Sequence, residues 1–302
     1  MKIDIDGLFV KQFEKSAHFK KVFQDLETVK KRVIDFGGFD YVLQFNPGRI
    51  GSATADTAKK VTEDECFLCE KHRFPNQIAV EYNENYNILI NPFPIFKKHL
   101  TIVDKRHVVQ EIRGEEKIMV EMSGNLPGFT VFYNSRHSGA SAPFHRHFQA
   151  CETVELPVFR QWDFFLSGGK ISEQNGSCLV FDGTRYFYMI NHSEASKAVE
   201  CLAGVLEKLQ SVHKTETPEA NVGIAFDNSV YRIVVFPRSK HRPREYFATG
   251  EGHFTISPGF ADMAGIIPCA VESDFYKLTK DNITSIFNQV TLEEKYLKEL
   301  SF

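Results

Sequence analysis

One order of secondary-structure elements occurs twice along this chain of 302 residues, and this repeat limits the fold more than any other feature. In the first half, strand-like apolar segments at 86–93 and 99–105 precede a helical pattern at 108–124. Two further strand-like segments, at 128–134 and 145–152, follow that pattern. The first half therefore has the predicted order β-β-α-β-β.

The second half has the same order with different residues. Segments 178–183 and 185–192 form a predicted hairpin, an amphipathic helix is predicted at 193–214, and segments 221–228 and 230–238 form a second hairpin. The apolar residues of this helix share one face: Val199, Leu202, Leu206 and Leu209. The repeat indicates an internal duplication in which the residues have diverged.

This alternation favours an α+β fold, in which two β-β-α-β-β halves form antiparallel sheets flanked by helices, over βαβ crossovers. We expect residues 1–155 to form the first half and residues 156–302 the second, packed as one unit. Residues up to about Phe36 have helical spacing, and a strand and a Gly/Ser/Thr-rich loop that carries Arg49 follow. The apolar residues of this helical pattern are Phe19, Val22, Phe23, Leu26, Val29 and Val33.

Two histidines and a glutamine alternate in the last strand-like segment of the first half. On an extended strand, His145, His147 and Gln149 point to one face, and the residues between them point to the other. The matching segment of the second half, 230–237, contains no histidine. This asymmetry predicts one catalytic half and one supporting half.

His147 is a candidate nucleophile, because a neutral imidazole attacks phosphorus readily and departs again as a cation. Gln149 can hold a phosphate oxygen but cannot transfer a proton at neutral pH. Asn134, at the end of the neighbouring strand, can bind a ribose or a phosphate. Small residues before His145 let main-chain N–H groups approach a phosphate, and the candidates are Ser138, Gly139 and Ser141. An isolated His-x-His pattern is most often structural, but these neighbours favour the catalytic interpretation.

A second group of residues has the types and spacing of a metal site. Cys66 and Cys69 have the C-x-x-C spacing of a zinc knuckle, and with His107 and His145 they would complete a Cys2His2 site. His72 and His99 are alternative ligands. A pair of cysteines without a metal is the competing interpretation.

The segment after the last strand of the second half is strongly basic. It contains Arg238, Lys240, Arg242 and Arg244. Lys240 is a candidate phosphate ligand, as is Arg49 in the first half. A solvated loop is an equally good interpretation of the basic segment.

Composition excludes several classes of partner. The net charge of -3 and the pI of about 6.4 give no general attraction for nucleic acid or an anionic membrane. No apolar run resembles a signal peptide or is long enough to span a bilayer, so a cytoplasmic protein is the simplest expectation. Six scattered cysteines argue against a secreted disulfide framework.

The motifs together resemble a known family. The segment "NSRHSGASAPFHRHFQ" at 134–149 is similar to the active-site segment of the transferase branch of the histidine-triad superfamily, which includes uridylyltransferases and nucleotide phosphorylases. "HLTIVDKRH" at 99–107 resembles the strand and basic histidine stretch of that superfamily, and "CFLC" at 66–69 resembles the zinc-binding turn of the uridylyltransferases. The resemblance covers about residues 49–155, and the second half matches in element order and little else.

The resemblance implies a duplicated half-barrel in which His147 is the covalent nucleophile and Gln149 binds the phosphate. It also implies a zinc ion held by Cys66, Cys69, His107 and His145. The expected activity is nucleotidyl transfer from a nucleoside diphosphate sugar or a dinucleoside polyphosphate, through a nucleotidyl-histidine, to phosphate or a sugar phosphate. An exposed sheet edge in such a fold commonly supports a homodimer.

Two other functions stay open at the level of the sequence. A hydrolase of the same superfamily is the first, although such hydrolases need a histidine at the position of Gln149 to protonate the leaving group. The second is a non-catalytic protein in which zinc stabilises a nucleotide-binding pocket.

The sequence departs from the transferase pattern at Phe144, which separates Pro143 from His145, and at Arg146, where the family often has proline. Phe148 replaces a small residue and argues against a strict galactose-1-phosphate enzyme.

Overall fold

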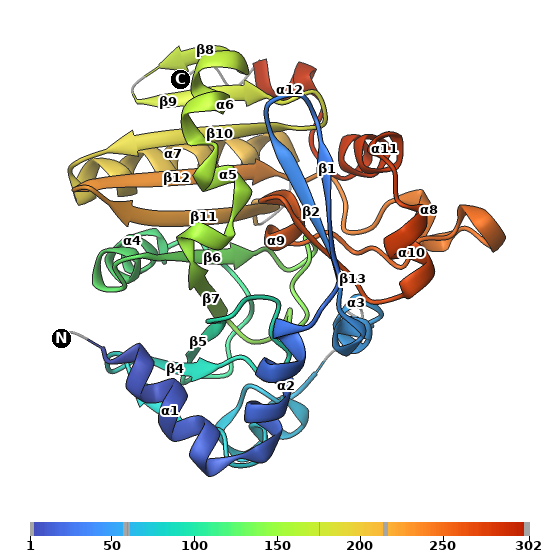
Figure 1. The fold of residues 1–302 in the computed structure, drawn as a ribbon. Coiled ribbons are helices and arrows are strands. Elements are labelled where there is room, and N and C mark those ends of the chain that lie inside the picture. The colour runs from blue at the N-terminus through green and yellow to red at the C-terminus, as the bar shows by residue number, and fades with distance from the viewer. Residues whose placement is uncertain (1–2, 57–58, 60, 175, 214–216, 299–302) are drawn as a thin grey trace.

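The computed structural model describes residues 3–56, 59, 61–174, 176–213 and 217–298. A ten-stranded antiparallel sheet forms the centre of the molecule, and a three-stranded sheet stands beside it (Figure 1). The large sheet contains β3 (Ala79–Glu81), β4 (Tyr86–Ile90), β5 (Leu100–Asp104), β6 (Phe129–Asn134), β7 (His147–Glu152), β8 (Lys170–Gln174), β9 (Ser177–Phe181), β10 (Tyr186–His192), β11 (Ala220–Asp227) and β12 (Val230–Pro237). The small sheet contains β1 (Lys31–Asp35), β2 (Asp40–Phe45) and β13 (Ile266–Cys269).

The strand order is mirrored about the centre of the large sheet. Counted inward from one edge, the strands are β3-β4-β5-β7-β6, and from the other edge they are β8-β9-β10-β12-β11. The two series meet where β6 pairs with β11 and Phe132 lies opposite Gly223. Helix α4 (Glu116–Asn125) follows β5, and α7 (Ala195–His213) follows β10 at the matching place. The repeated order and the α+β class predicted above are confirmed, and the boundary at residue 155 remains a prediction.

Further helices pack around these sheets. They are α1 (Ile5–Lys15), α2 (Ala17–Glu27), α3 (Ile50–Ala53), α5 (Pro157–Arg160), α6 (Trp162–Gly168), α8 (Arg244–Phe247), α9 (Phe260–Met263), α10 (Glu272–Lys277), α11 (Lys280–Val290) and α12 (Glu294–Lys298). Single 3-10 turns occur at Pro47–Arg49, Glu63–Glu65, Glu70–His72, Thr153–Glu155 and Gly250–Gly252. Within the described ranges, no helix combines the length and the apolar character that crossing a membrane requires.

The two faces of the large sheet are covered differently. One face packs against α4 and α7 in a core that includes Ile102, Phe148 and Leu206. On the other face, the strands of the second half are covered by a second core, to which Phe187 and Phe236 belong and to which α5, α6, α9 and α11 contribute. The same face of the first half borders a cavity. This asymmetry between the halves places the candidate site on the first half.

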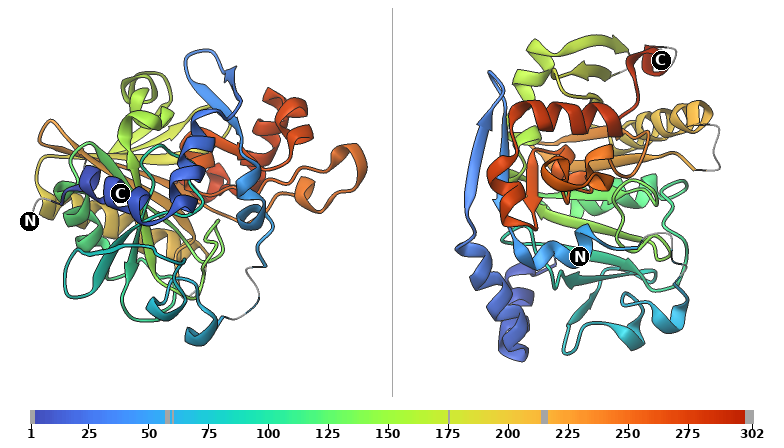
Figure 2. Two further views of the ribbon diagram at one scale, coloured as in Figure 1. Left: turned by 60° about the horizontal axis from the view of Figure 1, so that its bottom comes forward. Right: turned by 90° about the vertical axis from the view of Figure 1, so that its right-hand side faces the viewer.

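The N-terminal helical pattern predicted up to Phe36 is wrong beyond Glu27. Residues 31–35 form β1, and Val33 lies opposite Val42 of β2. Val33 fits helical spacing, but as a β-branched residue it also suits a strand. Pairing with β2 supplies the main-chain hydrogen bonds that stabilise the strand. β2 also pairs in parallel with β13, so the small sheet joins segments from near both ends of the chain. Figure 2 shows this blue hairpin beside the red C-terminal segments.

The helix predicted at 108–124 begins only at Glu116. Gly114 has a φ of +84°, which an α-helix does not accommodate, so the residues before it form an irregular segment. This segment carries Gln110, which reaches the backbone under the candidate site.

Candidate active site and metal centre

A cavity of about 650 Å³ lies over the open face of the first-half strands. Side chains from β5, β6 and β7 form part of its lining: Thr101, Phe132, Asn134, His147 and Gln149. Segments 48–55, 139–142 and 255–262 form much of its wall, and the first and last of them include α3 and the start of α9. The wall therefore combines segments that are far apart in the sequence.

The alternation along β7 directs His147 and Gln149 toward the cavity, while Phe148 between them is fully buried in the helix-covered core. His145 behaves differently from the prediction that it shares a strand face with the other two. It precedes the strand in a turn closed by a hydrogen bond from its N–H to the carbonyl oxygen of Ala142 at 3.2 Å. His145 is therefore free to belong to another site.

The ring of His147 has a defined tautomer. Its Nδ1 lies 2.8 Å from the carbonyl oxygen of His145, and because a carbonyl only accepts, Nδ1 must carry the proton. The lone pair of the neutral ring is then on Nε2. Burial lowers the pKa of His147 to about 4, which keeps the ring neutral at pH 7. These are the properties of an imidazole nucleophile.

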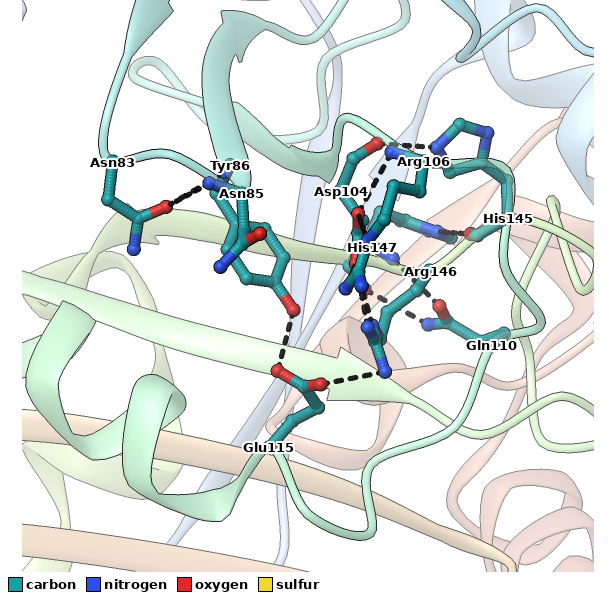
Figure 3. A network of polar contacts seen from close by, with 10 residues as sticks. All are labelled: Asn83, Asn85, Tyr86, Asp104, Arg106, Gln110, Glu115, His145, Arg146 and His147. Atoms are coloured by element: carbon teal, nitrogen blue, oxygen red, sulfur yellow. Dashed lines mark hydrogen bonds and ion pairs between the residues drawn. The ribbon is translucent and has the colours of Figure 1, made fainter.

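The side chain of Gln110 is hydrogen-bonded to the backbone of His147. Its side-chain oxygen accepts from the N–H of His147 at 2.8 Å, and its amide nitrogen donates to the carbonyl oxygens of His147 at 3.0 Å and of Asn134 at 2.9 Å. Gln110 therefore ties β6 to β7 at the site, as Figure 3 shows in part. Sequence reasoning did not find this residue, because nothing in its local pattern distinguishes it from a polar helical position.

The amide of Gln149 is oriented by His99. The N–H of Ile95 donates to Nδ1 of His99 at 3.1 Å, so the proton of the neutral ring is on Nε2, which donates to the amide oxygen of Gln149 at 2.9 Å. The NH2 group of Gln149 is then the donor available for a substrate oxygen. Burial lowers the pKa of His99 to about 3 and keeps its ring neutral. Both ring nitrogens of His99 are thus engaged behind the cavity wall, and His99 does not belong to the Cys/His cluster described below.

The four predicted metal ligands lie together. The ligand atoms of Cys66, Cys69, His107 and His145 are all within 4.8 Å of one another. Nδ1 of His145 lies 3.2 Å from Sγ of Cys66 and 3.4 Å from Sγ of Cys69, and Nδ1 of His107 lies 3.3 Å from Sγ of Cys69. Two thiols and two imidazoles within this spacing fit a tetrahedral metal such as zinc.

The outer nitrogens of both histidine ligands face main-chain carbonyls. Nε2 of His145 lies 2.7 Å from the carbonyl oxygen of Asp104, and Nε2 of His107 lies 3.3 Å from that of Val61. A carbonyl fixes the proton on Nε2 and leaves the Nδ1 lone pair directed at the cysteines, which is the usual support of a metal-binding histidine. His72, the other alternative ligand, is exposed and does not join this cluster.

The residue that departs from the family pattern, Phe144, is accommodated in the turn between Ala142 and His145. Its ring lies under the guanidinium of Arg136, 4.7 Å from carbon Cζ to the ring centroid. The strand that follows still begins at His147.

Of the small residues before His145 that were predicted to approach a phosphate, only some line the cavity. Gly139 and Ser141 line the cavity, whereas Ser138 is buried and donates to the carboxylate of Glu219 at 2.6 Å. Gly139 has a φ of +98°, and a Cβ at this position would lie 2.6 Å from Cα of Gly259. Glycine is therefore required for the close contact between the two halves at this point.

The predicted phosphate ligands are divided between the cavity and the surface. Arg49 lines the cavity and donates to the carbonyl oxygen of Phe93 at 2.7 Å, and burial lowers its pKa to about 10, which leaves it charged at pH 7. Lys240 is exposed and is not among the cavity residues. Asn134 lines the cavity, but its oxygen already accepts from Asn221 and from the N–H of Phe260, both at 2.7 Å.

Arg238, from the basic segment, is not at the surface. It is fully buried, and its guanidinium donates to a set of buried oxygen acceptors. Its acceptors within 3.2 Å are the side-chain oxygen of Asn221 and the carbonyl oxygens of Pro258, Lys240, His241 and Val290. The solvated-loop interpretation is wrong for this residue.

The second half also supplies cavity residues that sequence reasoning missed. Ser257 and His241 are paired, with 2.9 Å between Oγ and Nε2, and Asp262 lines the cavity near Arg49. Burial raises the pKa of Asp262 to about 7. No local pattern marks these residues, because they reach the site only through the packing of the two halves.

Comparison with known proteins agrees with this architecture. A family model described as a domain of unknown function, DUF4922, matches residues 8–152. No curated protein matches the sequence.

Among solved structures, yeast Ap4A phosphorylase Apa2 in complex with AMP has 16% sequence identity and a TM-score of 0.64, over 95% of this chain and 96% of that chain. The same enzyme in complex with Ap4A has 15% identity and a TM-score of 0.60, over 95% and 97% of the two chains. The likeness shows that this chain has the fold of that phosphorylase along nearly its whole length. The expected histidine-triad type of fold is thereby confirmed.

Proposed function

We propose that this protein, which has the fold of a nucleotide phosphorylase, transfers a nucleotidyl group through a covalent bond to His147. The proposed donors are a dinucleoside polyphosphate or a nucleoside diphosphate sugar, and the acceptor is phosphate or a sugar phosphate. Fold alone does not establish an activity, so the proposal depends on the site. The observation that carries it is the neutral His147, with its lone pair on Nε2, beside an oriented Gln149 at the same cavity.

In the first step, Nε2 of His147 attacks the α-phosphorus of the donor. A P–N bond forms, the bond from the α-phosphorus to the bridging oxygen breaks, and the leaving phosphate takes the bonding electrons. The ring becomes positively charged, and the carbonyl of His145 stabilises it through the proton on Nδ1. Gln149 and Arg49 donate to oxygens of the transferring group, which stabilises the charge that develops there.

In the second step, an oxygen of the acceptor attacks the same phosphorus, the P–N bond breaks, and His147 returns to the neutral ring. Dividing the transfer into two displacements is the advantage of covalent catalysis. A metal held by Cys66, Cys69, His107 and His145 would stabilise the structure of the turn that precedes His147. The chain's own residues carry the reaction.

The test is to incubate the protein with Ap4A or ADP-glucose without an acceptor. We expect a nucleotidyl mass on the peptide that contains His147, removal of that mass by added phosphate, and no adduct on a His147→Ala variant. Turnover that does not depend on phosphate would favour the hydrolase instead. Nucleotide binding without an adduct across UDP-, GDP- and ADP-sugars and dinucleoside polyphosphates would contradict the proposal and favour a binding protein.

A further inference from the structure

Arg146, between the two histidines, is held by two acidic residues and is not among the residues that line the cavity. Its Nη2 lies 2.7 Å from Oδ2 of Asp104, and its Nη1 lies 2.8 Å from Oε1 of Glu115 (Figure 3). The side chain of Arg146 is 11% exposed, that of Asp104 is fully buried and that of Glu115 is 19% exposed. We call these three residues the Arg146 clamp.

The clamp links the turn before β7 to β5 and to the start of α4. Asp104 ends β5, and Glu115 directly precedes α4. The other oxygen of Glu115 accepts from the hydroxyl of Tyr86 on β4 at 2.8 Å. The side chain of Arg146 is therefore paired with the end of β5 and the start of α4, and Glu115 connects it indirectly to β4.

Main-chain hydrogen bonds hold the same residue on both sides. The N–H of Arg146 donates to the carbonyl oxygen of Val108 at 2.7 Å, and its own carbonyl accepts from the N–H of Asp104 at 3.0 Å. Side chain and main chain together leave little freedom at this position.

The neighbours of Arg146 depend on the same contacts. The carbonyl of Asp104 accepts from Nε2 of His145 at 2.7 Å, and the carbonyl of His145 accepts from Nδ1 of His147 at 2.8 Å. A movement of this turn would therefore shift the ring of His147 toward or away from the cavity. Displacements of about 1 Å at a reacting group cost roughly 100-fold in rate.

We propose that Arg146 is a positioning residue for His147, acting through its ion pairs with Asp104 and Glu115. A buried ion pair contributes little net stability, but its fixed geometry can select one arrangement of the chain. In this protein the selected arrangement directs the lone pair of His147 into the cavity. The kinetic part of this inference rests on the proposed function, and its structural part does not.

The first experiment compares Arg146→Met with Arg106→Met. Arg106 pairs with the same Asp104, with 3.1 Å between Nη2 and Oδ2, but its side chain is 60% exposed, so it is a matched control. We expect Arg146→Met to lower kcat for nucleotidyl transfer about 10- to 100-fold, with KM within about threefold and zinc content unchanged. Arg106→Met should keep kcat within about twofold, since exposed ion pairs have small effects.

Two further variants test the same contact more gently. Arg146→Lys keeps one charge and should recover part of kcat, because an ammonium cannot bind both acids as a guanidinium does. Glu115→Gln removes the ion pair between Glu115 and Arg146 at a less buried site, and it should give a kcat between those of the parent and Arg146→Met. If Arg146→Met does not fold, Glu115→Gln still tests the proposal. An unchanged kcat in both Arg146→Met and Glu115→Gln would overturn the proposal. Loss of zinc in parallel with kcat would also overturn it, since Arg146 would then support the metal centre instead.

Crystal structures of the parent and of Arg146→Met separate this proposal from the proposed function. If the parent forms no nucleotidyl adduct, the proposed function fails and the structures still decide on the clamp. A displaced or rotated ring of His147 in the variant would support the positioning role. A ring that superimposes on that of the parent would overturn it.

Discussion

Nε2 of His99 lies 2.9 Å from the amide oxygen of Gln149, and this contact decides which end of the amide is offered to a substrate. The ring of His99 cannot reverse its role, because its Nδ1 accepts from the N–H of Ile95. An amide whose oxygen is occupied presents its NH2 group, which is the end that a phosphate oxygen requires.

Replacing His99 with phenylalanine should therefore weaken catalysis without removing a group that contacts substrate. The amide of Gln149 would lose its fixed orientation, and we expect kcat/KM to fall about tenfold, which is the usual cost of one buried hydrogen bond. Gln149→Glu should cost more, since a carboxylate repels the phosphate. Steady-state rates with Ap4A and phosphate measure both effects, and parental rates in His99→Phe would contradict the orienting role.

The metal centre should contribute to stability. Cys66→Ser removes one of four ligands, so we expect loss of bound zinc and a lower Tm, because metal binding contributes to the free energy of folding. Cys201→Ser is the control, because Cys201 contacts His192 and lies outside the cluster of four ligands. This variant should retain zinc. Elemental analysis and thermal unfolding test this, and full zinc content in Cys66→Ser would show that the four residues do not form the site.

The contact between Gly139 and Gly259 should not tolerate a side chain. Alanine at Gly139 meets a positive φ and a Cβ position 2.6 Å from Cα of Gly259, so we expect the free energy of unfolding to fall by about 1–3 kcal/mol. Gly204→Ala in α7 meets no atom within 4 Å and should raise it by about 0.5–1 kcal/mol. Urea unfolding of both variants measures the difference, and equal stabilities would contradict the argument.

The buried carboxyl of Asp262 should make stability depend on pH. Burial raises its pKa from 3.8 to about 7, and hydrogen bonds from the main chain and the charges of Arg238 and Arg49 offset part of this effect. The folded state then keeps a proton that the unfolded chain loses above about pH 4. The stabilising contribution is therefore complete below about pH 4 and is lost as the pH rises through about 7.

Asp262→Asn removes this titration while keeping an oxygen that can accept from the N–H of Gly259. The free energy of unfolding of the variant, relative to that of the parent, should rise between about pH 4 and pH 7. Above about pH 7 this difference should stay constant. Urea unfolding at several pH values measures this. A difference that does not change with pH would show that Asp262 is charged throughout.

Local patterns were sufficient for much of the fold and part of the site. The spacing of apolar residues predicted the repeated order of strands and helices, since each strand and helix imposes its own periodicity on the residues it buries. Alternation along one strand separated His147 and Gln149 from Phe148. The ligand types and spacing of the C-x-x-C turn likewise indicated a metal site.

Other local patterns were ambiguous because two structures satisfied them equally. Val33 fits both a helix and a strand, and only the pairing with Val42 decides between them. His99 has the chemistry of a metal ligand, but its contacts with Ile95 and Gln149 give it a different role.

The sequence by itself determined which residues carry reactive groups and that His147 and Gln149 share a face of one strand. The tertiary structure decided what surrounds those groups: Gln110 bound to the backbone of His147, the Arg146 clamp beside it, and the segments with His241 and Asp262 at the cavity. The physical reason is that periodicity is a property of neighbouring residues, whereas a cavity wall is made by segments that meet only when the chain packs. Arg238 illustrates the difference. A solvated loop was an equally good interpretation of its basic segment, but in the folded chain its guanidinium is buried and donates to carbonyl oxygens.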